Sequence, residues 1–390
     1  MLACLLCLSM APAAQSTDAQ ARASANLQSG RMSARHQAVQ RIEIVQQRGA
    51  RPRFSPDGSV MIFDRLNDDE FYDLYLGTRE GRVIRSLTEG RQDLPQRNNG
   101  NGRVHPSGAF VVFVSEEASH FGGSMRRLGD PGIGLFSNFR ATTAEANGVW
   151  RLTNIDIKKG MFDRTVAKAA VNPVFSPDGR TFVWTERYAS GGNHNWGRWR
   201  IKAADVVVRS GQPELQRERD LYTPKGSYAT AMAFLDSRHL LFSGNPEGQH
   251  EYGMDQYILD LDTNTVKNLT NTPGAWEEGS CVAPNGRIVY MTNIASRFPL
   301  DFKEANWAGQ PTERDYYIMD GDGGNKERLT FFNDPSSPEY VGGRAIVAAC
   351  DISPDGRFLA GTLGVDVSTG KRAELVLKVI VAEFRTPLKA

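Results

Sequence analysis

The chain has 390 residues, of which 46 are basic and 45 acidic, so its formal net charge is +1 at pH 7. This balance creates no strong global field that would favour nucleic acid or anionic membranes, so we expect no nucleic-acid partner. Its 38 glycines and 19 prolines, beside 40% hydrophobic residues, are typical of a globular protein that is rich in tight turns.

The chain begins with a short apolar run that ends in small residues, among them Ala11-Pro12-Ala13. A run of this kind is typical of a secretory signal peptide, to which we assign residues 1–14, although no basic residue precedes it. No later stretch approaches the ~20 apolar residues of a membrane-spanning helix. We therefore expect an exported protein without a membrane span, periplasmic or secreted, in which residues 15–40 form a flexible leader.

A five-residue turn motif then recurs six times, each time between two β-rich runs. Three copies read apolar-Ser-Pro-Asp-Gly and three are degenerate; they begin at Phe54, Phe175 and Ile352, and at Val104, Phe234 and Val282 respectively. Pro presets φ for the turn, Asp bonds its own backbone, and Gly adopts positive φ. Each copy therefore predicts a tight hairpin between two antiparallel strands.

Most copies are followed by a third strand and by a fourth that ends in Leu-Thr, at residues 87–88, 152–153, 269–270 and 329–330, with a looser copy at 221–223. Four strands at intervals of roughly 50 to 70 residues predict propeller blades. The last unit supplies only three strands, and an extra strand, Arg41–Val45, precedes the first motif. The sequence thus predicts an all-β fold over residues 41–390, a six-bladed β-propeller closed by pairing its N- and C-terminal strands, which removes an open edge.

These repeats resemble those of the TolB-like β-propeller family, whose blades carry the same Ser-Pro-Asp-Gly hairpin and the same Leu-Thr ending. The resemblance covers about residues 41 to 385 and implies the fold but not an activity, since such propellers serve binding, scaffolding and catalytic proteins. TolB itself carries an α/β domain before its propeller, whereas only about 40 residues stand there in this chain, and the Gly-x-Ser-x-Gly motif of related hydrolases does not occur. We therefore expect neither a true TolB role nor a serine peptidase.

The two faces of a propeller differ in their connections. The turn motifs lie on one face, here called the hairpin face. Loops from the second to the third strand lie with the inter-blade connections on the opposite, loop face. Those loops are long, at residues 64–70, 116–130, 186–198, 245–255 and 293–315, and long connections are where binding residues concentrate.

Aromatic, amide and charged residues gather on the loop face, and from them we predict a binding site made of His194, Asn195, Trp196, Glu251, Tyr252, Trp276, Glu277, Arg297 and Tyr340. A flat ring beside amides and carboxylates suits a sugar ring or an extended peptide. In the alternative interpretation, Trp196 and Trp276 only fill space between blades.

Three histidines, His120, His194 and His250, lie in three successive loops of the same face. Imidazoles with nearby carboxylates suit a divalent metal such as Zn or Mn, and the similar oligogalacturonate lyases hold a metal with histidines in a propeller. The acidic run Asp68-Asp69-Glu70 offers a Ca site instead. The alternative is that all these residues are solvated, while His105 replaces Ser in its hairpin and is interpreted as a turn residue.

Cys281 and Cys350 fall at similar positions of two repeats. An oxidising compartment would permit a disulfide, but their one-residue difference in register favours two buried thiols. For the whole protein we predict a monomeric binding or scaffold module for an envelope protein or a glycan, with no certain cofactor. The runner-up is a metal-dependent lyase or hydrolase of an extracellular polysaccharide, with Zn, Mn or Ca.

Overall fold

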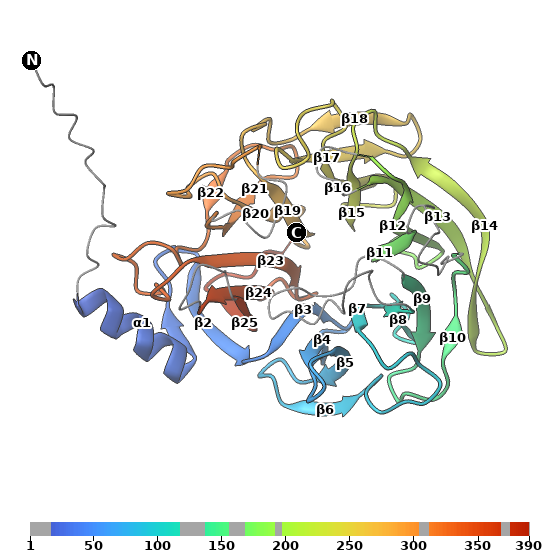
Figure 1. Cartoon of the computed structure of the whole chain (residues 1–390), viewed down its shortest axis with the longest axis horizontal. Helices are drawn as coiled ribbons and strands as arrows, with labels where there is room; N and C mark the ends of the chain where they lie inside the picture. The colour runs from blue at the N-terminus through green and yellow to red at the C-terminus, as the bar shows by residue number, and fades with distance from the viewer. Residues whose placement is uncertain are drawn as a thin grey trace, which may run out of the picture.

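The computed structural model describes residues 17–117, 137–155, 168–191, 197–303, 312–367 and 375–389. These residues form a six-bladed β-propeller, in which six antiparallel sheets stand around a common axis (Figure 1). Among them, no helix is long and apolar enough to cross a membrane.

Blades 1 to 5 each consist of four consecutive strands, which run outward from the axis in chain order. Blade 1 contains β3 (Gly49–Phe54), β4 (Met61–Leu66), β5 (Tyr72–Gly77) and β6 (Val83–Ser86), and blade 2 contains β7 (Asn99–Val104), β8 (Val111–Glu116), β9 (Ser137–Thr142) and β10 (Trp150–Arg151). Blade 3 contains β11 (Ala169–Phe175), β12 (Thr181–Ala189), β13 (Arg198–Arg209) and β14 (Gln212–Tyr222). Blade 4 contains β15 (Ala229–Phe234), β16 (His239–Gly244), β17 (Asp255–Asp260) and β18 (Thr265–Asn268), and blade 5 contains β19 (Glu277–Val282), β20 (Ile288–Thr292), β21 (Asp315–Met319) and β22 (Glu327–Arg328).

Blade 6 is assembled from both ends of the chain, as predicted. Its inner strands are β23 (Ala345–Ile352), β24 (Phe358–Asp366) and β25 (Leu375–Phe384), and β2 (Val39–Gln46) pairs with β25 on their outer side. A short strand, β1 (Arg31–Ser33), pairs with β2 and makes this the one five-stranded sheet among the described residues.

The turn motifs join the first and second strands of each blade. In the complete copies the Ser hydroxyl donates to the Asp carboxylate two residues later, as Ser55 does to Asp57 at 2.6 Å, and accepts the N–H of the next strand. His105 replaces Ser in its copy and bonds within the same turn, because its Nδ1 accepts the N–H of Ser107 at 3.1 Å. The structure thus confirms His105 as a turn residue.

The Leu-Thr endings recur because the threonine connects the third and fourth strands. Thr270 Oγ1 accepts the N–H of Gln256 at 3.0 Å and donates to the buried carboxylate of Asp255 at 3.1 Å. The same two bonds occur in blades 1, 2 and 5 at Thr88, Thr153 and Thr330, with Asp73, Asn138 and Asp315 as acceptors. The acceptor lies 15 residues before the threonine each time.

The segment predicted to be a flexible leader contains a helix. Residues Thr17–Ser29 form α1, which lies at the outer edge of the ring beside blade 6 (Figure 1). Its buried residues, Ala19, Ala23 and Asn26, share one face, and the two alanines pack on Tyr340. Asn26 donates from Nδ2 to the carbonyl oxygens of Pro338 and Tyr340 at 2.8 and 2.9 Å. Contacts with the segment around Tyr340, rather than a continuous apolar stripe of its own, therefore hold this polar helix in place.

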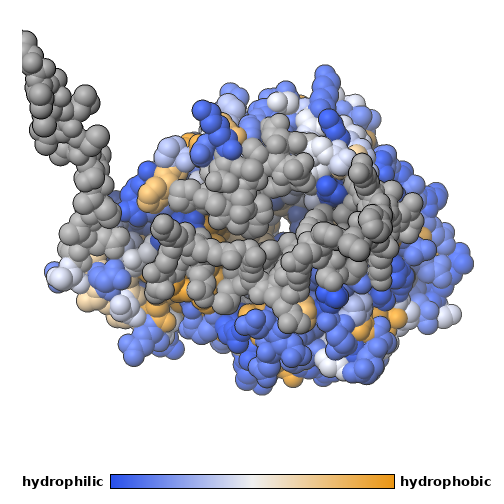
Figure 2. Space-filling view, in the orientation of Figure 1, coloured by the Kyte–Doolittle hydropathy of each residue, from blue (hydrophilic) through white to orange (hydrophobic). Residues whose placement is uncertain are grey.

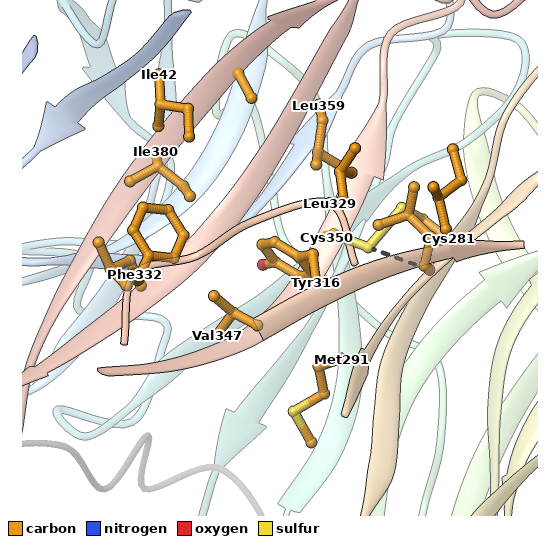
Figure 3. Packing of buried hydrophobic residues seen from close by; sticks show 14 of the residues in the cluster. Ile42, Cys281, Met291, Tyr316, Leu329, Phe332, Val347, Cys350, Leu359 and Ile380 are labelled. Carbon is orange, nitrogen blue, oxygen red and sulfur yellow. Dashed lines mark hydrogen bonds between the residues drawn. A yellow bond between two sulfur atoms is a disulfide. The ribbon is translucent and has the colours of Figure 1, made fainter. Parts of the chain in front are cut away.

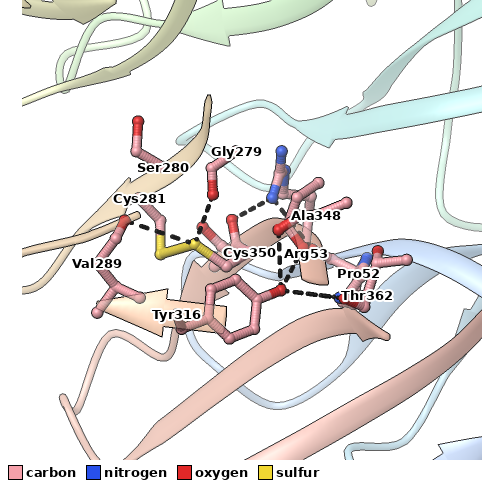
Figure 4. The surroundings of a disulfide bond; sticks show 12 residues. Pro52, Arg53, Gly279, Ser280, Cys281, Val289, Tyr316, Ala348, Cys350 and Thr362 are labelled. Atoms are coloured by element: carbon pink, nitrogen blue, oxygen red, sulfur yellow. Dashed lines mark hydrogen bonds between the residues drawn. A yellow bond between two sulfur atoms is a disulfide. The ribbon is translucent and has the colours of Figure 1, made fainter. Parts of the chain in front are cut away.

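Cys281 and Cys350 form a disulfide between the inner strands of blades 5 and 6 (Figures 3 and 4). The prediction of two free thiols was wrong for a geometric reason. Facing surfaces of adjacent blades are opposite faces of their two sheets, so a one-residue offset points the two side chains toward each other. The bridge crosses a buried cluster that includes Val289, Tyr316 and Leu359.

Candidate functional site

The structure describes only part of the predicted loop-face site. His120, His194, Asn195 and Trp196 lie outside the described residues. The histidine-metal prediction therefore rests on His250, whose ring stacks on Phe302 with centroids 4.7 Å apart. Among the described residues, no three His, Cys, Asp or Glu side chains are arranged to hold a metal. The metal site and the lyase function stay predictions.

The predicted aromatic residues of blade 5 and its neighbour are interior. Tyr252 and Trp276 stack nearly parallel, with centroids 5.4 Å apart, and are 0% and 3% exposed. The Arg314 guanidinium lies 4.0 Å from the centre of the indole ring, and the indole N–H donates to Glu278 at 3.2 Å. This is the arrangement of the alternative interpretation, in which Trp276 fills space between blades.

The remaining predicted residues also have partners within the fold. Glu251, Glu277 and Tyr340 are buried. Glu251 accepts a hydrogen bond from Ser227 at 3.0 Å, and burial raises the pKa of Glu277 to about 7. Arg297 alone is half exposed, and its guanidinium forms an ion pair with Glu313. The predicted site residues that the structure describes are thus not gathered into one accessible site.

A funnel on the axis at the hairpin face is the better candidate. It is a cavity of about 280 Å³, to which blades 1, 2, 3, 4 and 6 contribute. On the face that Figure 2 shows, the described residues at the periphery of the ring are mostly hydrophilic. The funnel exists because each inner strand places the residues before its turn motif around the same axis.

The funnel wall has three layers, set by position in the repeat. The rim consists of the motif residues Ser55, Pro56, Pro106, Ser176, Pro177 and Pro354. Below it lie the motif's first residues, Phe54, Val104, Phe175, Phe234 and Ile352. The floor contains the residues just before these, Arg103, Val174, Ala233 and Asp351. The funnel is therefore apolar except at its floor.

The rim serines contribute little polarity to the funnel. The hydroxyls of Ser55 and Ser176 donate to Asp57 and Asp178, both at 2.6 Å, and accept from the backbone of the next strand. Among the described lining residues, only Arg103 and Asp351 then offer charged groups.

Positive charge exceeds negative charge around the floor, because Arg53, which is not itself a lining residue, adds its charge to that of Arg103. Arg53 precedes Phe54 as Arg103 precedes Val104, and the two guanidinium groups come from adjacent inner strands. Arg53 donates to the carbonyl oxygen of Cys350 beside the disulfide (Figure 4). Asp351 accepts the N–H of Phe54 at 2.8 Å and lies 3.4 Å from Arg103.

Sequence reasoning missed this site because it considered loop length. The usable signal was the residue before each turn motif, which reads Arg, Arg, Val, Ala, Cys and Asp from blade 1 to blade 6. Three charged residues at a position that faces a ring axis distinguish this position from an ordinary strand.

The C-terminal tail crosses the same face. The N–H of Leu388 donates to the carbonyl oxygen of Gly356 at 2.8 Å, and its own carbonyl oxygen accepts from Asn285 at 3.3 Å. The tail therefore lies as an extended segment between the turn motifs of blades 5 and 6, and the C-terminus is drawn near the centre of the ring (Figure 1).

The sequence matches no protein-family model and no curated protein. Among solved structures, it is similar to a putative TolB from Agrobacterium tumefaciens, with 16% identity, a TM-score of 0.46, and coverage of 87% of this chain and 90% of that one. TolB from Acinetobacter baumannii is similar with 15% identity and a TM-score of 0.46, and the match covers 90% of this chain and 66% of that one. An oligogalacturonate lyase from Vibrio parahaemolyticus is similar with 11% identity and a TM-score of 0.44, and the match covers 90% of this chain and 96% of that one. The chain is a six-bladed β-propeller, and its repeats resemble those of TolB-like propellers.

Proposed function

We propose that the protein is a non-catalytic binding module, exported to the cell envelope or beyond, that receives an extended polypeptide segment of a partner in the axial funnel. The observation that carries this proposal is the wall of the funnel, with proline and aromatic residues above a floor that bears Arg103 and Asp351. Apolar walls with few placed polar groups are typical of binding sites.

The lining favours a polypeptide over a glycan. A sugar ring needs many hydrogen-bond partners, whereas the rim hydroxyls of Ser55 and Ser176 are already engaged within their own turns. The volume, about 280 Å³, lies just below the ~300–1,000 Å³ of small-molecule pockets. It suits one or two side chains of a longer segment that continues over the rim.

The hairpin face also has a way of holding an extended backbone. The protein's own tail bonds through Leu388 to turn residues of two adjacent blades. A partner segment would use backbone groups of the same kind at the rim. Export is supported by the Cys281–Cys350 disulfide, because disulfides persist in oxidising compartments.

Site-specific photocrosslinking in the producing cells tests the proposal. A benzophenone amino acid replaces Ser107, which is exposed beside the rim residue Pro106, and a control replaces Asp262, exposed in an outer turn between β17 and β18. We expect a protease-sensitive adduct from position 107 only, and the wall substitution Phe234→Ser should abolish it.

Two outcomes would contradict the proposal. An adduct at position 107 that resists protease but yields to a glycosidase would identify a glycan ligand. Equal adducts at positions 107 and 262, unaffected by Phe234→Ser, would mean that the funnel is not the binding site.

A further inference from the structure

The groups near the funnel floor include three guanidiniums and two carboxylates. Arg51 and Arg53 belong to β3 and Arg103 to β7, whereas Asp64 belongs to β4 and Asp351 to β23. Arg51 forms an ion pair with the fully buried Asp64. Asp64 and Asp351 both interact with Arg53 as well. Among the described residues, two carboxylates therefore face three guanidiniums, which leaves an excess of one positive charge.

Asp351 balances this charge incompletely. One of its oxygens accepts the backbone N–H of Phe54 at 2.8 Å, and the other lies 3.4 Å from Arg103 Nη1. Arg103 Nε lies 3.4 Å from the carbonyl oxygen of Pro173. Both contacts of Arg103 are long compared with the 2.7–2.9 Å of charge-assisted hydrogen bonds.

The environment makes a further anion favourable here. Burial and the neighbouring charge of Arg103 lower the pKa of Arg53 to about 9. Two like charges held together away from water repel each other, and an incoming anion reduces that repulsion. The Arg103 side chain, 20% exposed, is open to the funnel.

We propose that the funnel selects a partner segment that bears a carboxylate, and that Arg103, with Arg53 beside it, binds this group at the floor. The inference rests on the proposed function and specifies its ligand. A guanidinium binds a carboxylate through two parallel N–H donors, a geometry that an amide or hydroxyl does not match. The carboxylate is supplied either by an Asp or Glu side chain or by a chain terminus, and the apolar wall holds the residues next to it.

Three pools of fluorescein-labelled hexapeptides test the inference by fluorescence anisotropy. All are randomised among Leu, Val, Phe, Pro, Ser and Ala except at one internal position. The first pool has Glu there and an amidated C-terminus, the second has Gln and an amidated C-terminus, and the third has Gln and a free C-terminal carboxylate. We expect the first or third pool to bind at least about tenfold more tightly than the second, as one charge-assisted bond allows. Which of the two does so identifies the source of the carboxylate.

Variants assign the effect to the floor. Arg103→Gln should abolish the preference between pools, and Arg103→Lys should restore part of it. Asp351→Asn should tighten binding of the carboxylate pool severalfold, because it removes the competing anion, and a misfolded variant would not give tighter binding. Arg180→Gln is the matched control, since Arg180 is exposed on the same face outside the funnel, and it should change neither pool.

The outcomes separate the two proposals. Equal affinity of the wild-type protein for all three pools would overturn the carboxylate inference and leave a polypeptide-binding funnel in place. A preference that persists in Arg103→Gln would likewise overturn the assignment to this arginine. If no pool binds the wild-type protein, the proposed function itself fails.

Discussion

Removing the bridge between Cys281 and Cys350 should lower the melting temperature by about 6 °C. The two residues are 69 positions apart in the sequence. In the chain-entropy model, a crosslink that closes a loop of this length destabilises the unfolded chain by about 4 kcal/mol at 25 °C. At ~2.1 cal/mol/K per residue, a propeller of about 350 residues unfolds with an entropy of about 0.7 kcal/mol/K, which gives the temperature shift.

Calorimetry of the wild-type protein with and without dithiothreitol measures this shift, and the double variant Cys281→Ala/Cys350→Ala is the control. The reductant should lower the melting temperature of the wild type and leave that of the double variant unchanged. Peptide mapping without reductant should recover the two cysteines in one linked fragment. Two free thiols in freshly purified, denatured protein, or a shift below 1 °C, would refute the reasoning.

Three further predictions concern the repeat, a buried acid and the N-terminal helix. Thr270→Val should cost about 2–3 kcal/mol in unfolding experiments, because a buried N–H and the Asp255 carboxylate lose a partner, whereas the exposed Thr263→Val should cost nothing measurable. The raised pKa of Glu277, about 7, means that the folded state retains its proton. The free energy of unfolding of the wild type should therefore fall relative to that of Glu277→Gln by about 3 kcal/mol as pH rises from about 4.5 through 7. Denaturant unfolding at several pH values measures both, and equal pH profiles would contradict this. Asn26→Ala should release α1, detected as faster tryptic cleavage after Arg22 with an unchanged melting temperature.

The fold was predictable because its signals are local and repeated. The three complete copies of the turn motif carry Pro, Asp and Gly within five residues, and the three degenerate copies keep part of this pattern at similar places in their repeats. The sequence alone therefore locates all six hairpins. The closing strand was predictable by counting, since the last unit lacked one strand and Arg41–Val45 supplied it. The 15-residue spacing of Asp255 and Thr270 was also visible, but only the hydrogen bonds explain it.

The site was less predictable because exposure depends on tertiary packing. Tyr252 and Trp276 have the composition of a binding site, yet they are buried between blades. Helix α1 has few apolar residues, and its partner Tyr340 is more than 300 residues away. Loop length indicated a face of the molecule but not which of its side chains reach a ligand.

Blade 6 contains strands from both termini, and this has a consequence for the order of folding. The pairing of β2 with β25 joins residues such as Ile42 and Ala382, so the last sheet forms only after nearly the whole chain has been synthesised. Until then, blades 1 to 5 are an incomplete arc whose end surfaces are open to wrong partners. Contacts of such long sequence separation form slowly, so ring closure is the step at which a chaperone or a misfolding reaction would compete.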